Sequence, residues 1–161
     1  MSVRAATAAD HAAIRSVLDA AFGNDHATLI VDGVRAEGAA LAELVAEADG
    51  EIVGHVLFSR MTVTPVRFFA GLGPVGVRPD RQGGGHGEAL CRAGIETVRA
   101  LGAEAVVVLG HETYYPRFGF SHAAAAKIAS PFAERPAFMA LALVPGALDA
   151  PLRVDYPAAF G

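Results

Sequence analysis

The residues whose types and spacing could do chemistry gather at residues 82–87, which read Gln-Gly-Gly-Gly-His-Gly. Glycines leave backbone N–H groups uncovered and tolerate positive φ, and a helical pattern follows them directly. A helix N-terminus carries free amides and a partial positive charge, so this turn is able to bind phosphate without a lysine. The same residues would also suit a tight strand-to-helix turn that binds nothing.

Two familiar nucleotide-binding motifs do not fit this turn. No Gly-Lys-Ser/Thr follows the glycines, which excludes a Walker A loop, and the spacing of a dinucleotide fingerprint is missing. The next strand pattern, at 105–109, leads into Gly110-His111 rather than into the acidic residue that would bind a ribose.

The remaining reactive residues form no second motif. The histidines stand at positions 11, 26, 55, 86, 111 and 122 without metal-ligand spacing and without a cysteine pair, so no metal site is predicted. Cys91 falls on the apolar face of its helix, where a buried and inert thiol is the ordinary outcome. A covalent acyl carrier at Cys91 is therefore disfavoured.

The elements around the glycine turn form a βαβ unit. Residues 66–77 read as a strand interrupted by glycines and Pro74, which indicates a bulge or a close approach by another backbone or a ligand. An amphipathic helix with Leu90, Ile95 and Val98 on its apolar face follows the turn and ends at Gly102. The Val-rich run 105–109 is typical of a strand buried on both faces and parallel to a neighbour.

The rest of the chain predicts a strand–helix–hairpin order. We expect a strand at 3–5, a helix that Thr7 caps and Gly23 ends, and a weaker helix at 25–35. Strands at 41–48 and 51–60 are separated by the turn Asp49-Gly50. Further strands are predicted at 120–124 and 138–144, and residues 156–161 read as a tail.

Length, composition and charge limit the classes of protein. With 161 residues, of which 53% are apolar and 19% charged, we expect a single globular domain over 1–161. A net charge of −4 leaves no basic face for nucleic acid or an anionic membrane. One cysteine, no signal-peptide pattern and no apolar run long enough to span a bilayer predict a cytoplasmic protein.

With these motifs in view, the chain resembles the GNAT superfamily of acyl-CoA-dependent N-acyltransferases. The diagnostic Gln/Arg-x-x-Gly-x-Gly/Ala is matched by Gln82, Gly85 and Gly87, after Val75-Gly76-Val77 and Pro79. A second element, Tyr-x-x-x-Gly-Phe, is matched by Tyr115, Gly119 and Phe120. The resemblance spans residues 1–124, and His86 departs from it because the family usually has an aliphatic residue there.

The resemblance implies an α/β (α+β) fold: a mixed, mostly antiparallel sheet with one central parallel pair of strands that splay apart, flanked by helices. It implies acetyl-CoA as co-substrate, with pantetheine along Val75 and Val77. The pyrophosphate would rest on the turn, Gln82, Gly83, Gly84, Gly85, His86 and Gly87. Tyr115 would protonate the leaving thiolate, with Tyr114 as the reserve candidate.

The implied reaction is direct attack by a primary amine, from a small molecule or a protein, on the thioester in a ternary complex. The general base stays open among Glu112, His111, His55 and water. The family resemblance alone also suggests a homodimer. Two alternatives remain: a non-catalytic acyl-CoA-binding or regulatory module that keeps the turn, and a nucleotide-binding protein.

Overall fold

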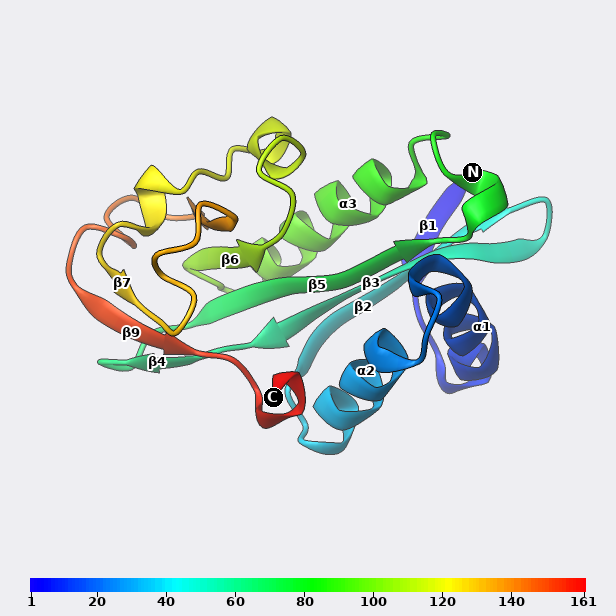
Figure 1. Cartoon of the computed structure of the whole chain (residues 1–161), viewed down its shortest axis with the longest axis horizontal. Helices are drawn as coiled ribbons and strands as arrows, with labels where there is room; N and C mark the ends of the chain where they lie inside the picture. Colours follow the sequence, from blue (N-terminus) through cyan, green and yellow to red (C-terminus); the bar gives the residue numbers. More distant parts are fainter.

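The computed structural model describes all residues, Met1–Gly161, and contains two β-sheets and three α-helices (Figure 1). The six-stranded sheet has the order β1-β2-β3-β5-β6-β8, with bounds Ser2–Ala5, Ala40–Ala48, Glu51–Arg60, Phe69–Val77, Ala105–Leu109 and Phe138–Ala142. The three-stranded sheet has the order β4-β9-β7, with bounds Thr62–Thr64, Leu152–Asp155 and Ile128–Ala129. The helices are α1, α2 and α3, with bounds His11–Phe22, His26–Ala36 and His86–Ala100.

The six-stranded sheet is antiparallel everywhere except between β5 and β6, which run parallel. Helix α3 connects these two strands, so the predicted βαβ unit is confirmed. Figure 1 shows α3 on one side of the sheet and α1 and α2 on the other. The predicted fold class, a mostly antiparallel mixed sheet with one parallel pair and flanking helices, is therefore confirmed as well.

Strands β5 and β6 separate halfway along β5. Their pairing covers only Phe69–Leu72 against Ala105–Val108. On its other edge β5 stays paired with β3, but the register jumps from Val56↔Val75 to Phe58↔Leu72. One β3 residue therefore faces two β5 residues, Gly73 and Pro74, which is a β-bulge. Gly73 has φ 131°, a conformation that side chains rarely adopt, so glycine is required at this position.

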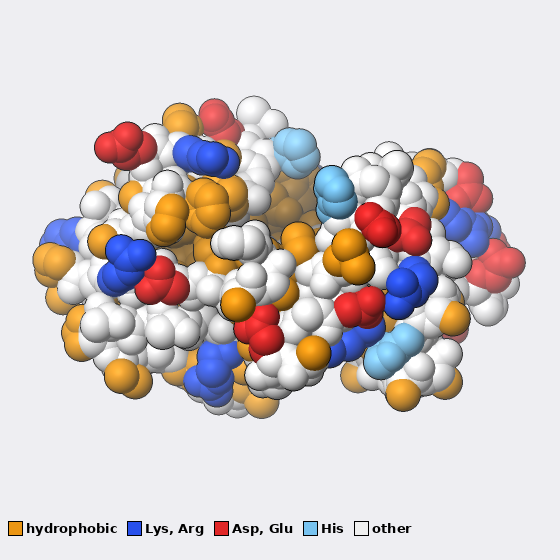
Figure 2. Space-filling view, turned by 60° about the horizontal axis from the view of Figure 1, so that its bottom comes forward, with side chains coloured by type: hydrophobic (Ala, Val, Ile, Leu, Met, Phe, Trp, Pro, Cys, Tyr) orange, Lys and Arg blue, Asp and Glu red, His pale blue; other side chains and the backbone are white.

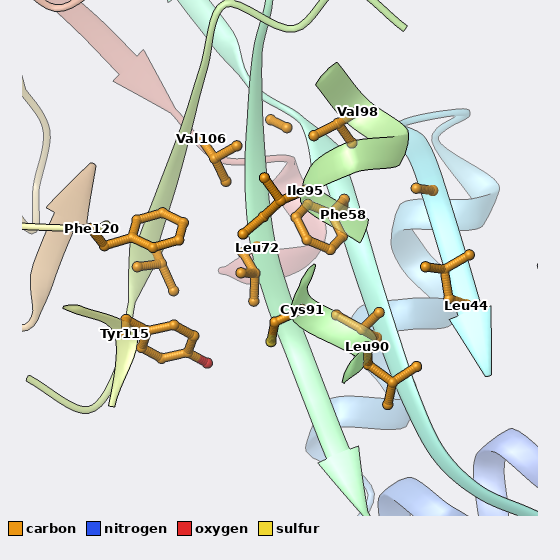
Figure 3. Close-up of a cluster of buried hydrophobic side chains, with 14 of the residues drawn as sticks. Leu44, Phe58, Leu72, Leu90, Cys91, Ile95, Val98, Val106, Tyr115 and Phe120 are labelled. Carbon is orange, nitrogen blue, oxygen red and sulfur yellow. The ribbon is translucent and has the colours of Figure 1, made fainter. Parts of the chain in front are cut away.

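Alternation along the strands divides the core between the two faces of the sheet. Val56 and Phe58 of β3 belong to a cluster on the α3 face, together with Leu90, Ile95 and other side chains drawn in Figure 3. Leu57, between them, joins a second cluster with Ile14, Leu18, Val31 and Val34 of α1 and α2. The sheet is thus buried on both sides, which explains why the β3 segment reads as a nearly continuous apolar run.

A third cluster fills the space between the far half of the six-stranded sheet and the small sheet. Phe69, Val107 and Phe138 pack there against side chains of the small sheet, such as Val63 and Val154. The sequence analysis missed the small sheet. Its strands are two to four residues long, and β4 pairs with β9 across about ninety residues of chain.

Two predictions at the C-terminal end are wrong. Residues 120–124 form no strand: only Ser121 bridges to Ala140, and a 3₁₀ helix, Ala123–Ala125, follows because the Ser121 hydroxyl accepts the Ala124 N–H at 3.0 Å. Residues 156–161 are not a free tail. The 3₁₀ helix Ala158–Phe160 docks on α2, where the Glu37 carboxylate accepts the N–H groups of Ala158 and Ala159 at 3.2 and 2.7 Å.

The contact between α3 and β3 depends on a glycine. A Cβ at Gly94 would lie 2.1 Å from Cε1 of Phe58, so Gly94→Ala should lower the free energy of unfolding in urea by about 1–3 kcal/mol. The clash should outweigh the ~1 kcal/mol that alanine normally contributes in a helix. In the double variant Phe58→Leu/Gly94→Ala the two losses should be less than additive, since the smaller side chain admits the methyl group. Simple additivity would contradict this packing.

Candidate functional site

The glycine turn and the start of α3 form one wall of a pocket of about 350 Å³, called here the α3 pocket. Gly83 and Gly85 have φ of 83° and 84°, and a Cβ on either would meet no atom within 4 Å. Glycine is therefore needed for backbone conformation and not for space. The pocket is lined by Val77, Arg81, Gln82, Gly83, Gly85, His86, Gly87, Glu88, Tyr114 and Arg117.

The turn is tied to the end of β5. The Gln82 side-chain amide donates to the carbonyl oxygen of Val77 at 3.1 Å, across the mouth of the turn. Gly85 is the N-cap residue of α3 and contributes no side chain that could occupy the free amides of the first helical turn. These amides remain available to an anion from outside the chain.

Two arginines, which the sequence analysis did not single out, add positive charge. Arg117 donates to the carbonyl oxygen of Tyr114 at 2.9 Å and lies over the Tyr114 ring, 4.2 Å from its centroid. Arg81 pairs with Asp49 of the β2–β3 turn at 2.7 Å. Glu88 is the acidic residue of the pocket, and its carboxylate is 3.3 Å from Arg117. Arg81 precedes the glycine turn and Arg117 lies inside the second predicted motif. The sequence gives no sign that both line one pocket at the start of α3.

The neighbouring tyrosines lie in different places. Tyr114 lines the α3 pocket, where a Cβ on Gly87 would be 3.4 Å from its hydroxyl oxygen. The Tyr115 ring is buried against Phe120, and its hydroxyl points toward Cys91 and β5 (Figure 3). Gly110 makes room for this ring, because a Cβ there would be 2.4 Å from it. Burial raises the pKa of the Tyr115 phenol above its ordinary value, which keeps the phenol protonated.

Of the other predicted donor-site residues, Val77 and His86 line the α3 pocket, whereas Val75 and Gly84 do not. Val75 and Val77 lie on β5 beyond its last residue paired with β6, and both are half-buried. A Cβ on Gly84 would be 3.4 Å from the ring of His86, which is folded against the turn. His86 is the first residue of α3; it is buried, and its Nδ1 has no hydrogen-bond partner.

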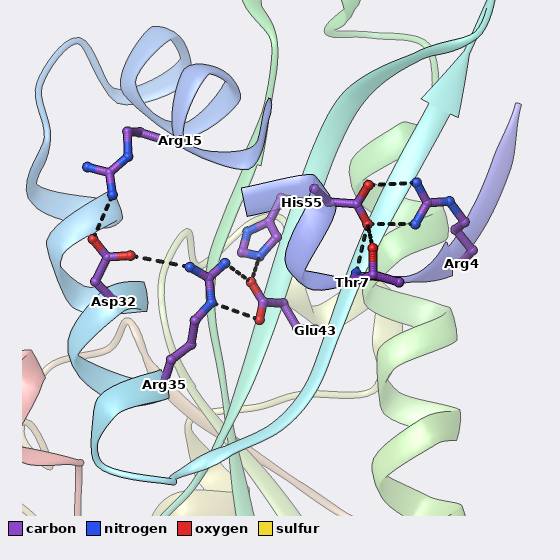
Figure 4. Close-up of polar contacts among 8 residues, drawn as sticks. Arg4, Thr7, Arg15, Asp32, Arg35, Glu43 and His55 are labelled. Atoms are coloured by element: carbon purple, nitrogen blue, oxygen red, sulfur yellow. Dashed lines mark hydrogen bonds and ion pairs between the residues drawn. The ribbon is translucent and has the colours of Figure 1, made fainter. Parts of the chain in front are cut away.

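The candidate bases are not brought together. His111 and Glu112 are exposed in the loop after β6 and line neither the α3 pocket nor the apolar pocket described below. His55 is fully buried, and its Nε2 lies 2.8 Å from Glu43. The network of Figure 4 continues from Glu43 through Arg35 to Asp32, on the α2 side of the sheet.

Glu43 is held as a carboxylate inside this network. Burial opposes its charge, but hydrogen bonds from His55 and Arg35 outweigh burial and lower its pKa to about 2. The network therefore fastens α2 to β2 and β3, and Glu43 and His55 lie outside the α3 pocket.

Cys91 is buried, and burial raises the pKa of its thiol to about 12, as expected for an inert core cysteine. No group of three or more His, Cys, Asp or Glu side chains is placed to hold a metal ion. None of the helices combines the length and the apolar character needed to cross a bilayer.

A second pocket, called here the apolar pocket, opens on the face of the sheet opposite α3. It measures about 340 Å³ and is lined by Leu72, Gly73, Pro74, Leu109, Phe132, Tyr156 and Phe160. Gly73 and Pro74 form the bulge of β5, and Leu109 ends β6, so this pocket lies where the two strands diverge. Figure 2 shows a hollow with a hydrophobic floor between the part carrying the small sheet and the part carrying α1 and α2.

Residues 11–120 match the acetyltransferase (GNAT) family, and this chain belongs to that family. The uncharacterized N-acetyltransferase YjhQ of Escherichia coli is 42% identical over 125 residues, which are 73% of this chain and 68% of that protein. A GNAT acetyltransferase from Brucella melitensis, solved with acetyl-CoA, has a TM-score of 0.83 at 37% identity, covering 99% and 97% of the two chains. YhbS from E. coli, solved with CoA, has a TM-score of 0.90 at 30% identity, covering 99% and 91%.

The low pKa of Glu43 gives a stability prediction. Because the pKa falls from 4.5 to about 2 on folding, the carboxylate stabilises the fold above pH 5, and this stabilisation is lost as the pH drops toward 2. In urea denaturation at pH 7, Glu43→Gln should therefore have a lower free energy of unfolding than the wild type, by up to about 3 kcal/mol. This difference should become smaller as the pH falls toward 2. Glu96→Gln, at a site 68% exposed on α3, should follow the wild-type acid profile. A difference in free energy of unfolding between Glu43→Gln and the wild type that stays constant with pH would contradict an ionised Glu43.

Proposed function

We propose that this chain transfers an acetyl group from acetyl-CoA to a primary amine by direct attack in a ternary complex. The observation that carries the proposal is the continuity of two features. The unpaired edge of β5 leads straight into the α3 pocket, so one path joins a strand edge to an anion site. The relatives from B. melitensis and E. coli, solved with acetyl-CoA and CoA, support the same donor here.

The donor suits this path chemically. Its diphosphate would take hydrogen bonds from the amides of residues 82–87 and charge from Arg81 and Arg117. Its pantetheine arm, which carries two amides, would pair with the backbone near Val75 and Val77 as an added strand does. A nucleotide without such an arm would leave that edge unpaired, which favours acetyl-CoA over ATP or NAD.

The chain's own groups can serve each step of the transfer. The neutral amine attacks the thioester carbonyl, and a backbone N–H beside the β5 bulge, where Pro74 itself has none, would stabilise the negative oxygen. The carbon–sulfur bond then breaks, and Tyr115 would give its proton to the departing thiolate. The nitrogen loses its extra proton to water, since no candidate base lines either pocket. Buried Cys91 is unsuited to carry the acetyl group, which favours direct transfer.

The glycine turn can be tested with a matched pair of variants. Gly85→Ala forces a side chain into φ 84° at the start of α3 and should weaken acetyl-CoA binding about tenfold, because the amides turn away from the diphosphate. Gly102→Ala imposes the same kind of strain, φ 98°, at the opposite end of the 15-residue helix α3. Isothermal titration should give a wild-type dissociation constant for Gly102→Ala. Equal affinities of the two variants for acetyl-CoA would contradict diphosphate binding by the amides of the glycine turn.

The two tyrosines separate turnover from binding. Tyr115→Phe should lower kcat by about 10²-fold, the lower end of general acid effects, and leave acetyl-CoA affinity near the wild-type value. Tyr114→Phe should instead change the KM for acetyl-CoA, because Tyr114 lines the α3 pocket. Thiol release with a primary amine measures both. Wild-type kcat in Tyr115→Phe would rule out the acid role, and tight binding without turnover of any amine would favour a non-catalytic acyl-CoA-binding module.

A further inference from the structure

The α3 pocket contains a charge of the wrong sign for an anion site. Its lining includes two arginines and one carboxylate, Arg81, Arg117 and Glu88. Arg81 pairs with Asp49, which lies outside the pocket. Arg117 pairs with Glu88 instead, whose Oε1 is 3.3 Å from its Nη1. One of the two cationic side chains is therefore neutralised from within the pocket.

Glu88 lies between two partners. Its other carboxylate oxygen, Oε2, is 3.5 Å from Nε of Arg92, one turn further along α3 and outside the lining of the pocket. The side chains of Glu88, Arg92 and Arg117 are 42%, 54% and 45% exposed. Ion pairs between side chains as exposed as these contribute little to stability. The carboxylate is therefore able to leave Arg117 and keep Arg92 at small cost.

Arg117 does not depend on Glu88 for its position. Its Nε donates to the carbonyl oxygen of Tyr114, and its guanidinium lies over the Tyr114 ring. These two contacts would keep the guanidinium at the pocket when the carboxylate moves away. Arginine binds phosphate oxygens through short, charge-assisted hydrogen bonds, which are stronger than an exposed ion pair at 3.3 Å. A diphosphate would thus be able to displace Glu88 from Arg117.

We propose that Glu88 competes with the diphosphate of the donor for Arg117, which rests on the donor site of the proposed function. The carboxylate would turn to Arg92 when the diphosphate binds and return to Arg117 when CoA leaves. After it has turned, its negative charge still opposes the diphosphate, because Glu88 stays in the first turn of α3. Acetyl-CoA and CoA carry the same diphosphate, so Glu88 weakens the binding of both and thereby limits inhibition by the product.

Removing the charge should tighten binding. Glu88→Gln keeps the size of the side chain and should lower the dissociation constants of acetyl-CoA and CoA about three- to tenfold, as measured by isothermal titration at low salt. The gain should shrink as salt is added, because ions screen exposed charges. Glu96→Gln makes the same charge change at a site on α3 outside the pocket and should keep the wild-type constants. Unchanged or weaker binding in Glu88→Gln, as expected if Glu88 only supports the helix, would overturn the inference.

Double-mutant cycles test the exchange of partners. Arg117→Gln should weaken CoA binding, and in its background the gain from Glu88→Gln should fall to about twofold or less, since nothing is left to compete for. Arg92→Gln removes the alternative partner and should weaken CoA binding in the wild type, but have a much smaller effect beside Glu88→Gln. Additive effects in the cycle with Arg117 would overturn the competition, and additive effects in the cycle with Arg92 would overturn the turn of the carboxylate toward Arg92.

Dephospho-CoA, which keeps the diphosphate and lacks the 3′-phosphate, identifies the competing anion. The gain from Glu88→Gln should persist with this probe. A gain seen with CoA and lost with dephospho-CoA would overturn the assignment to the diphosphate.

The same titrations separate the two proposals. No binding of acetyl-CoA or CoA to the wild type or to Glu88→Gln would overturn the proposed function and this inference with it. Binding with equal constants in the two proteins would overturn the role of Glu88 and leave the donor site intact.

Discussion

The separation of β5 from β6 after Leu72 is the constraint on which the rest of the structure depends. Two adjacent strands normally satisfy each other's backbone groups along their whole length. Here the bulge at Gly73 and Pro74 redirects β5, and one edge of that strand runs on without a neighbour. The same divergence opens the sheet between its two faces. A polar pocket at the start of α3 and an apolar pocket on the other face are thereby placed on either side of one gap.

Side chains pack on both faces of the sheet beside the gap between β5 and β6. On the α3 face, Phe58 packs closely against Gly94 and fixes the contact between α3 and β3. The Tyr115 ring packs closely on Gly110, just after the end of β6, and its hydroxyl points toward Cys91. On the other face the third cluster and the α1–α2 cluster are separate bodies of side chains, and neither extends across the gap. The clusters on the two faces are therefore packed separately on either side of the opening.

Local patterns predicted the parts of this arrangement that are encoded locally. The glycine turn, the flanking strand and helix, and the buried strand β6 each have a periodicity or a turn residue that fixes them. The small sheet could not be found this way, because Thr62–Thr64 and Leu152–Asp155 are too short to show a period and meet only in the folded chain. For the same reason Arg81 and Arg117 were missed as pocket residues, and Tyr156 was assigned to a tail. A side chain's identity does not say which cavity it faces.

The position of the apolar pocket wall follows from contacts that lie outside both pockets. Arg35 of α2 pairs with Glu43 of β2, which also accepts from His55 of β3, so α2 is fixed to the centre of the sheet. Near the end of α2, Glu37 binds the amides of Ala158 and Ala159, and Gly33 lies so close to Ala159 that a Cβ there would approach within 2.6 Å. Phe160 is the next residue, and it lines the pocket. The half-buried ion pair thus fixes the helix on which the Phe160 segment docks, although α2 contributes no side chain to either pocket.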